Sequence, residues 1–195
     1  MNDQILWFAT RGAGAVSLLL LTAVACLGIM TVGRFQRPGW PRFVTAEIHR
    51  NLALLSTAFL AVHVITAIAD PYTSLGLAAA LVPFASSYRP LWVGLGVISV
   101  DLGVAIVATS LLRDRIGRRA WRAIHWLAYA AWPLAVVHSV GSGSDAGAVW
   151  MLTIDAACVI AFGAAVAWRL LAVERLALDE VVDAGRATAD RSFRS

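Results

Sequence analysis

The four histidines of this chain lie in two of its long apolar stretches, two in each. His49 and His63 are 14 residues apart in the first stretch, and His125 and His138 are 13 residues apart in the second. Imidazole is the commonest metal-ligating side chain, and it also carries protons near neutral pH. The pattern therefore indicates metal ligands, a proton path or a set of hydrogen-bonded packing residues.

The composition places these histidines in a membrane protein. Of the 195 residues, 59% are hydrophobic and 14% are charged, whereas a soluble globular domain is typically about 45–50% apolar. The mean hydropathy is +0.74, and long uncharged runs recur along the chain. The composition therefore excludes soluble enzymes and nucleic-acid-binding proteins, although the isoelectric point is near 9.8.

Five uncharged runs are long enough to cross a bilayer, because a hydrocarbon core about 30 Å thick needs about 20 apolar residues in a helix. These predicted spans are residues 12–33, 45–69, 91–112, 120–141 and 147–173. A sixth apolar stretch, residues 74–86, contains Pro83 and is shorter, so we expect an interfacial or re-entrant loop there. We expect an all-α fold, a bundle of five transmembrane helices.

The arginines predict how this bundle is oriented, and all 16 basic residues are arginines. Most of them follow or flank the first connection, the third connection or the last span, and only Arg11 and Arg89 lie on the other side. By the positive-inside rule, the N-terminus is expected outside and the C-terminus in the cytoplasm. We therefore expect a multi-pass protein of the cell membrane.

One membrane domain is expected, comprising residues 1–172, and no internal repeat is obvious. The first 11 residues lack a basic region before the apolar run, so we expect an uncleaved first span rather than a signal peptide. In residues 173–195, charged residues alternate with aliphatic ones. This tail is predicted to form a short amphipathic cytoplasmic helix with a frayed end.

The histidines pair by depth in the membrane. Because one span separates the two histidine-bearing spans, these two helices run parallel, so His49 and His125 share the cytoplasmic side and His63 and His138 the outer side. The first two each follow an arginine by seven residues, and the last two each precede an aspartate by seven. With a rise of 1.5 Å per residue, the two layers are about 20 Å apart.

Each layer offers two imidazoles and no clear third donor. A zinc site needs three or four ligands in one place, whereas a haem needs only two axial ligands because the porphyrin supplies the other four. Two histidine pairs on parallel spans therefore fit two stacked b-type haems. The alternative is that all four are hydrogen-bonded packing residues.

The second pair requires a change of helical direction. Fourteen residues at 100° each return to within about 40° of the same helix face, whereas thirteen leave the second side chain about 140° away. Pro133 lies between His125 and His138, and we expect the fourth span to kink there.

These histidines and their surroundings, HRNLALLSTAFLAVHV and RAWRAIHWLAYAAWPLAVVHS, resemble the ferric reductase-like transmembrane domain. Ferric reductases, the membrane part of NADPH oxidases and the haem subunit of the periplasmic methionine-sulfoxide reductase system share this domain. The resemblance covers residues 10–172 and implies that His49 and His125 ligate an inner b-type haem and His63 and His138 an outer one. NADPH-dependent relatives continue into FAD- and NADPH-binding domains, so here we expect a flavin only through a partner.

Three arginines are candidates for holding haem propionates. Arg50 and Arg122 neighbour the inner histidines, and Arg89 lies on the outer side. A guanidinium pairs well with carboxylates. The alternative for the inner arginines is topological, since cytoplasmic connections are rich in arginine in any case.

Two acidic and three aromatic residues within the spans are further candidates. Asp101 lies in the middle of the third span, and Asp155 lies about eight residues into the fifth, near the depth of the outer histidines. Each is interpreted as an acceptor for the free N–H of a ligating imidazole, as part of a proton path or as a packing residue. Trp126, Tyr129 and Trp132 follow helical spacing between the two layers, where they line the path of an electron or pack around a large cofactor.

We therefore expect a diheme membrane cytochrome, an oxidoreductase component that moves single electrons across the bilayer. With both axial positions filled, the iron has no open site, which favours electron transfer over oxygen chemistry. By the resemblance, a cytoplasmic flavoprotein or quinol is the donor, and an extracytoplasmic reductase or flavoprotein is the acceptor of this relay subunit. The alternatives are a ferric-chelate reductase component and a haem-free membrane scaffold or transporter.

Overall fold

Long apolar stretches fold into helices because a helix satisfies its own backbone hydrogen bonds in hydrocarbon. The computed structural model describes residues 2–32, 42–71, 73 and 75–192, and these residues form seven helices and no strand. The helices are α1 (Asn2–Val32), α2 (Arg42–Ala69), α3 (Leu77–Leu81), α4 (Pro90–Leu111), α5 (Arg113–His125), α6 (Ala128–Gly141) and α7 (Val149–Ser192). The predicted all-α fold is confirmed.

Four helices contain a segment long and apolar enough to cross a membrane. These segments are Gln4–Thr31, Phe43–Ala69, Pro90–Leu111 and Val149–Val173. The bent pair of α5 and α6 gives a fifth crossing if the two helices together form one span. The described part of the chain is therefore that of a multi-pass membrane protein, and the five-residue α3, within the predicted loop of residues 74–86, is too short to span.

A break separates α5 from α6 where the sequence predicts one continuous span with a kink at Pro133. The two helices meet at an angle of 45°. The break falls at Trp126 and Leu127, and Pro133 lies within α6, so the predicted position of the kink is wrong. The arginine-rich α5 is exposed along most of its length. Because charged side chains are costly in hydrocarbon, α5 turns away from the direction of the apolar α6.

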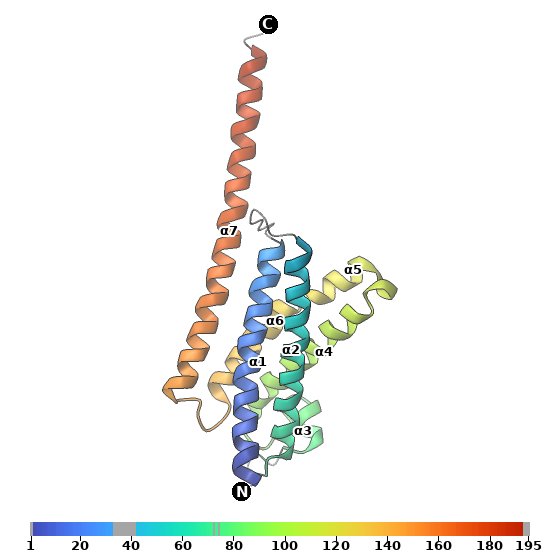
Figure 1. The fold of residues 1–195 in the computed structure, drawn as a ribbon, viewed down its shortest axis with the longest axis vertical. Helices are drawn as coiled ribbons and strands as arrows, with labels where there is room; N and C mark the ends of the chain where they lie inside the picture. The colour runs from blue at the N-terminus through green and yellow to red at the C-terminus, as the bar shows by residue number, and fades with distance from the viewer. Residues whose placement is uncertain (1, 33–41, 72, 74, 193–195) are drawn as a thin grey trace.

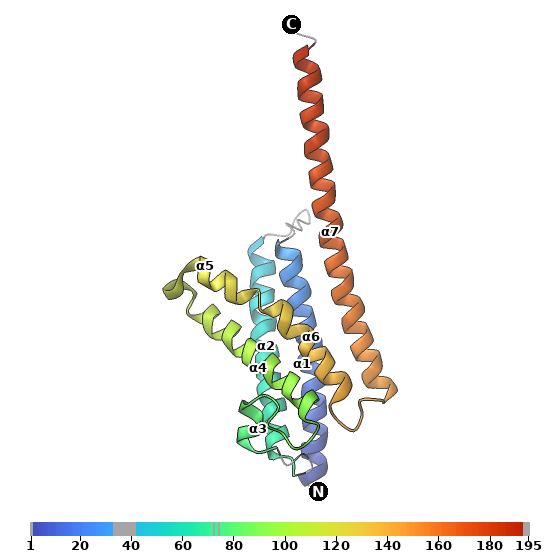
Figure 2. The same cartoon turned by 180° about the vertical axis from the view of Figure 1, so that it is seen from behind.

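Two helical hairpins build the bundle (Figure 1). α1 and α2 pack side by side, and α4 packs against α5 and α6. The view from behind shows α4 and α6 inclined to the α1–α2 pair, with α5 projecting from the side (Figure 2). α7 lies against α1 and α6. Each hairpin thus carries two of the four histidines on its second arm.

A small core holds α6 against α1 and α7. Its buried members are Leu18, Trp132, Val136 and Cys158. The Trp132 ring stacks on Phe162 with centroids 3.9 Å apart and planes 11° apart, and its Nε1–H donates to Thr22 Oγ1 at 2.9 Å. These contacts fix the orientation of α6 and therefore of the histidine near its end.

The last helix continues past the predicted end of the fifth span. α7 runs without interruption to Ser192 and extends beyond the rest of the bundle (Figure 1). A separate short helix in residues 173–195 was expected, whereas the described part of this tail, to residue 192, continues the spanning helix.

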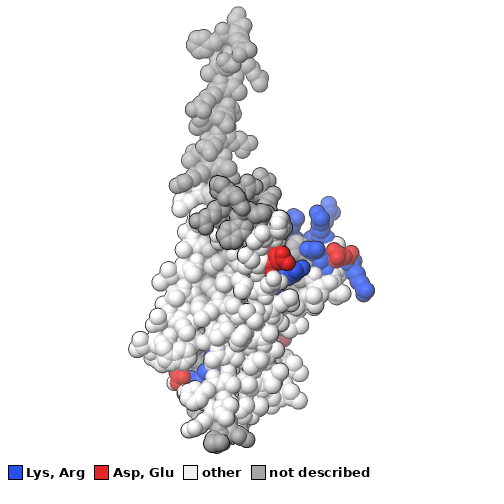
Figure 3. Space-filling model, in the orientation of Figure 1, with Lys and Arg blue, Asp and Glu red and all other residues white. Residues whose placement is uncertain are grey.

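A group of basic side chains lies on α5. The arginines of α5 form a group that we call the α5 patch, comprising Arg113, Arg115, Arg118, Arg119 and Arg122, all exposed. Figure 3 shows basic side chains together at this position, beside a large uncharged surface. An uncharged surface of this kind is suited to contact with lipid.

Candidate cofactor site

The four histidines form two pairs in space. The ring centroids of His49 and His125 are 6.2 Å apart, with planes at 58°. Those of His63 and His138 are 6.3 Å apart, with planes at 80°. In each pair, one ring comes from α2 and the other from α5 or α6. The structure thus brings together the residues whose spacing predicts a common depth.

The separation within each pair leaves space for one atom between the rings. An imidazole nitrogen lies about 1.15 Å from its ring centroid, so a direct N–H···N bond of about 2.9 Å allows a centroid separation of at most about 5.2 Å. Two imidazoles on opposite sides of one metal ion, with bonds of about 2.0 Å, have centroids about 6.3 Å apart. The observed separations agree with the second arrangement.

A large, partly open cavity connects the two pairs. Its volume is about 1540 Å³, and all four histidines line it. Residues of all seven helices line it, mostly from α1, α2, α4, α5 and α6, and its lining is mostly apolar. Because pockets for a single small ligand typically have about 300–1,000 Å³, the cavity is large enough for more than one such ligand.

The His63–His138 pair is held by backbone carbonyl groups. His63 Nδ1 lies 2.8 Å from the carbonyl oxygen of Thr10 in α1, and His138 Nδ1 lies 2.8 Å from that of Trp92 in α4. A carbonyl oxygen only accepts hydrogen bonds, so each Nδ1 carries the proton. The lone pair of Nε2 is then available to a metal.

The His49–His125 pair is held differently. Nδ1 of each ring is buried and has no hydrogen-bond partner within the described part of the chain. The His125 ring stacks on Trp121, with centroids 5.0 Å apart and planes at 30°. Trp121 in turn donates its Nε1–H to Ser110 Oγ at 3.3 Å. Stacking thus orients this imidazole in place of a hydrogen bond.

The three arginines predicted as propionate partners have different environments. Arg50 and Arg122 line the cavity, and Arg50 also forms an exposed ion pair with Glu47 at 3.4 Å. Arg89 is absent from the described cavity lining; its Nη1 donates to the carbonyl oxygen of Gly141 at 2.6 Å. The structure therefore brings two of the three to the cavity.

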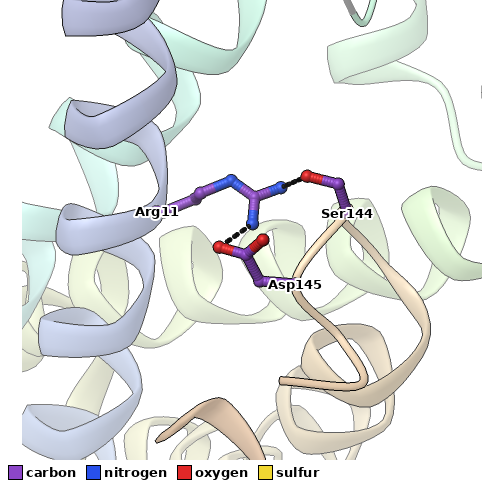
Figure 4. A network of polar contacts seen from close by, with 3 residues as sticks. All are labelled: Arg11, Ser144 and Asp145. Atoms are coloured by element: carbon purple, nitrogen blue, oxygen red, sulfur yellow. Dashed lines mark hydrogen bonds and ion pairs between the residues drawn. The ribbon is translucent and has the colours of Figure 1, made fainter. Parts of the chain in front are cut away.

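A fourth arginine, Arg11, lines the same cavity and was not among the predicted site residues. It extends from α1 toward the loop after α6, where it binds Asp145 at 2.5 Å and Ser144 at 2.6 Å (Figure 4). Its guanidinium also lies over the Trp7 ring, 4.3 Å from the centroid. In the sequence, its only signal is that it lies on the arginine-poor side.

Asp101 and Asp155 were candidates to accept a hydrogen bond from an imidazole, but neither contacts an imidazole nitrogen. Asp155 is buried, but its Oδ1 accepts from Ser139 Oγ at 2.9 Å, and the Nδ1–H of His138 binds Trp92 instead. Asp101 is exposed on α4 and is absent from the described cavity lining. The acceptors are main-chain carbonyls, which the side-chain pattern of a sequence does not reveal.

The aromatic stripe lies along the cavity. Trp126, Tyr129 and Trp132 all line it. Trp132 is a core residue, whereas Trp126 and Tyr129 are more exposed and lie 5.1 Å apart between ring centroids. Tyr129 accepts a hydrogen bond from Arg169 Nη1 at 3.1 Å. The packing interpretation therefore describes Trp132 best.

The fold and the paired imidazoles define a membrane helical bundle with a histidine-lined cavity between its helices. The family model for the ferric reductase like transmembrane component matches residues 12–136, and the chain belongs to this family. Its members generally contain a haem-binding, electron-transfer domain. The matched segment includes His49, His63 and His125 and ends two residues before His138. No curated protein and no solved structure matches the chain.

The residues of each pair fit a haem better than a bare metal ion. No group of three or more histidine, cysteine, aspartate or glutamate side chains able to hold a metal occurs within the described residues. A haem iron needs two axial ligands from the protein, and each pair supplies two imidazoles at the separation of trans ligands. At the His49–His125 pair, both Nδ1 atoms are also buried without a hydrogen bond among the described residues, and such atoms are uncommon outside functional sites.

Proposed function

We propose that the chain is a diheme b-type cytochrome that relays single electrons across the membrane. The observation that carries this proposal is the separation of the two imidazole pairs, 6.2 Å and 6.3 Å, within one apolar cavity. His49 and His125 hold the inner haem, and His63 and His138 hold the outer one. When bound between these imidazoles, each haem would supply a one-electron iron couple.

The chain orients its ligands and shields them from water. The carbonyls of Thr10 and Trp92 fix the protonated nitrogen of the outer imidazoles, which leaves Nε2 for the metal. Apolar side chains line most of the cavity. Arg50 and Arg122 at the inner pair bind propionates by charge-assisted hydrogen bonds, whereas Arg89 and Asp155 support the protein around the outer pair through Gly141 and Ser139.

The distribution of charge supports one direction for the electron. The α5 patch adjoins His125, which ends α5, and arginine-rich connections are cytoplasmic in most membrane proteins. The inner pair therefore receives electrons from a cytoplasmic flavoprotein or a quinol. The outer pair passes them to a partner reductase or flavoprotein outside. Residues 1–172 form the electron-transfer domain, and the remainder is a cytoplasmic extension.

The test is a reduced-minus-oxidised optical spectrum of the detergent-purified protein with haem quantified per chain. Two low-spin b-type haems per chain are expected, and His63→Ala and His125→Ala should each retain one. The control is Thr153→Ala, because Thr153 is exposed on α7, is absent from the described cavity lining and bonds only within its own helix, to Val149. That variant should keep both haems.

Two results would contradict the proposal. A colourless protein, despite haem supplied during expression, would favour the haem-free scaffold or transporter. Loss of haem from Thr153→Ala to the same extent as from the histidine variants would show that the spectrum reports general folding and not ligation.

A further inference from the structure

The two outer imidazoles meet the same backbone arrangement on two different helices. His63 binds the carbonyl of Thr10, and the residue four positions later in α1 is Gly14. His138 binds the carbonyl of Trp92, and the residue four positions later in α4 is Gly96. Both bonds are 2.8 Å long.

The glycines are required by the closeness of the rings. A Cβ atom at Gly14 would lie 2.8 Å from His63 Nδ1, and one at Gly96 would lie even closer to His138 Nδ1. In an α-helix, the carbonyl of residue i accepts the N–H of residue i+4, and its oxygen has a second lone pair. A glycine at i+4 leaves that lone pair accessible to a donor from the neighbouring helix.

A second hydrogen bond, from a serine to a backbone carbonyl, also occurs at equivalent positions of the two hairpins. Ser17, three residues after Gly14, donates to the carbonyl of Ser56 at 3.4 Å. Ser99, three residues after Gly96, donates to the carbonyl of Ala131 at 2.9 Å. Ser56 and Ala131 each precede the outer histidine of their own hairpin by seven residues.

In the inner layer, a glycine occupies the corresponding position in α1 but not in α4. Gly28 follows Gly14 by 14 residues, and a Cβ there would lie 3.4 Å from His49 Cε1, an ordinary contact distance. The residue 14 positions after Gly96 is Ser110, which binds Trp121 instead. Neither inner Nδ1 forms a hydrogen bond of good geometry among the described residues, although the backbone of Val24, four residues before Gly28, interacts with His49.

We infer that Gly14 and Gly96 are positioning residues for the outer pair of haem ligands. By leaving the carbonyls of Thr10 and Trp92 open, they allow each imidazole to donate its Nδ1–H, which sets the ring orientation and raises the basicity of Nε2. This inference rests on the proposed function, in which the same imidazoles ligate haem. The inference implies that the two layers orient their ligands differently. Carbonyl groups left open by glycine orient His63 and His138 in the outer layer, whereas stacking on Trp121 orients His125 in the inner layer.

The experiment compares Gly14→Ala and Gly96→Ala with two helical glycines that lie outside the cavity lining. Gly12→Ala in α1 and Gly163→Ala in α7 are the controls, because no described atom lies within 4 Å of a Cβ at either position. For each purified variant we would measure haem per chain, the low-spin EPR signals and the two reduction potentials. Alanine is favoured over glycine within a helix, so the controls should behave like the parent.

The expected result is a change confined to one and the same haem in both test variants. Each should either lose that haem, which halves the haem content, or shift its EPR signal and raise its potential, because a less basic imidazole stabilises ferric iron less. The other haem reports that the bundle is folded. Test variants that match Gly12→Ala and Gly163→Ala in EPR signals and potentials would overturn the inference.

A measurement on the unaltered protein covers the case in which a test variant fails to fold. In the reduced, low-spin state, proton NMR with exchange into D₂O follows the ligand Nδ1–H groups. Two slowly exchanging signals are expected from His63 and His138 and faster exchange from His49 and His125, and equal exchange for all four would also overturn the inference. A parent protein without haem would instead refute the proposed function, so the two failures are distinguishable.

Discussion

A histidine binds a metal through the nitrogen that its other hydrogen bonds leave free. At the outer pair, Thr10 and Trp92 supply the acceptors for His63 and His138 through main-chain carbonyls. Replacing the side chain of Thr10 or Trp92 should therefore leave these hydrogen bonds in place, whereas a side chain added beside the carbonyl, at Gly14 or Gly96, should disrupt them. Residues near this pair act on the ligands through the backbone, and Arg11 is the charged residue best placed to hold that backbone in position.

Removing the charge of Arg11 should destabilise the protein measurably. Its ion pair with Asp145 is partly shielded, with side chains 17% and 25% exposed, so Arg11→Gln should cost about 1–3 kcal/mol, between the values for exposed and buried pairs. Thermal unfolding in detergent measures the change. The control is Arg119→Gln, which removes one exposed charge of the α5 patch outside the described cavity lining and should have little effect. Equal midpoints for the two variants would refute this role.

At the scale of the helices, spacing predicts which histidines pair, but it does not predict where the helix between His125 and His138 bends. Seven-residue intervals to arginine and aspartate place the histidines at matching depths, and helical rise alone gives the pairing. The break at Trp126 and Leu127 depends on where the charged α5 leaves the hydrocarbon, which competes with the local effect of Pro133. Gly14 and Gly96 form no recognisable sequence motif, because each acts by leaving open the backbone carbonyl four residues earlier, which any residue type can supply.

Trp132 is predicted to be the side chain that holds α6 most strongly. Replacing it with phenylalanine removes the Nε1–H donor to buried Thr22 and part of the stack on Phe162. Trp132→Phe should therefore lower the free energy of unfolding by about 1–3 kcal/mol. Trp126→Phe, at a site 52% exposed, should change it by less than about 0.5 kcal/mol. Chemical unfolding followed by circular dichroism compares them, and a larger loss for Trp126→Phe would contradict the assignment.

At the scale of the whole molecule, two hairpins of similar design enclose one cavity. The sequence shows no obvious repeat, because the shared features are a glycine, a serine three residues later and a histidine on the next helix, spread over tens of residues. Composition and hydropathy do predict the bundle, since apolar runs of this length have few other solutions. The continuous α7 is not predicted, because a change in composition at residue 173 does not by itself end a helix.

The two-layer arrangement predicts electron flow from one face of the membrane to the other. In vesicles containing the purified protein, an impermeant reductant on the side of the α5 patch should drive reduction of an impermeant oxidant on the opposite side. His63→Ala and His125→Ala each interrupt one layer, so either should reduce the rate at least tenfold, whereas Thr153→Ala should not. Rates that match protein-free vesicles would refute a transmembrane relay. Sustained reduction of a ferric chelate by this chain alone would instead favour the ferric-chelate reductase component, since a dedicated relay requires its partner protein for turnover.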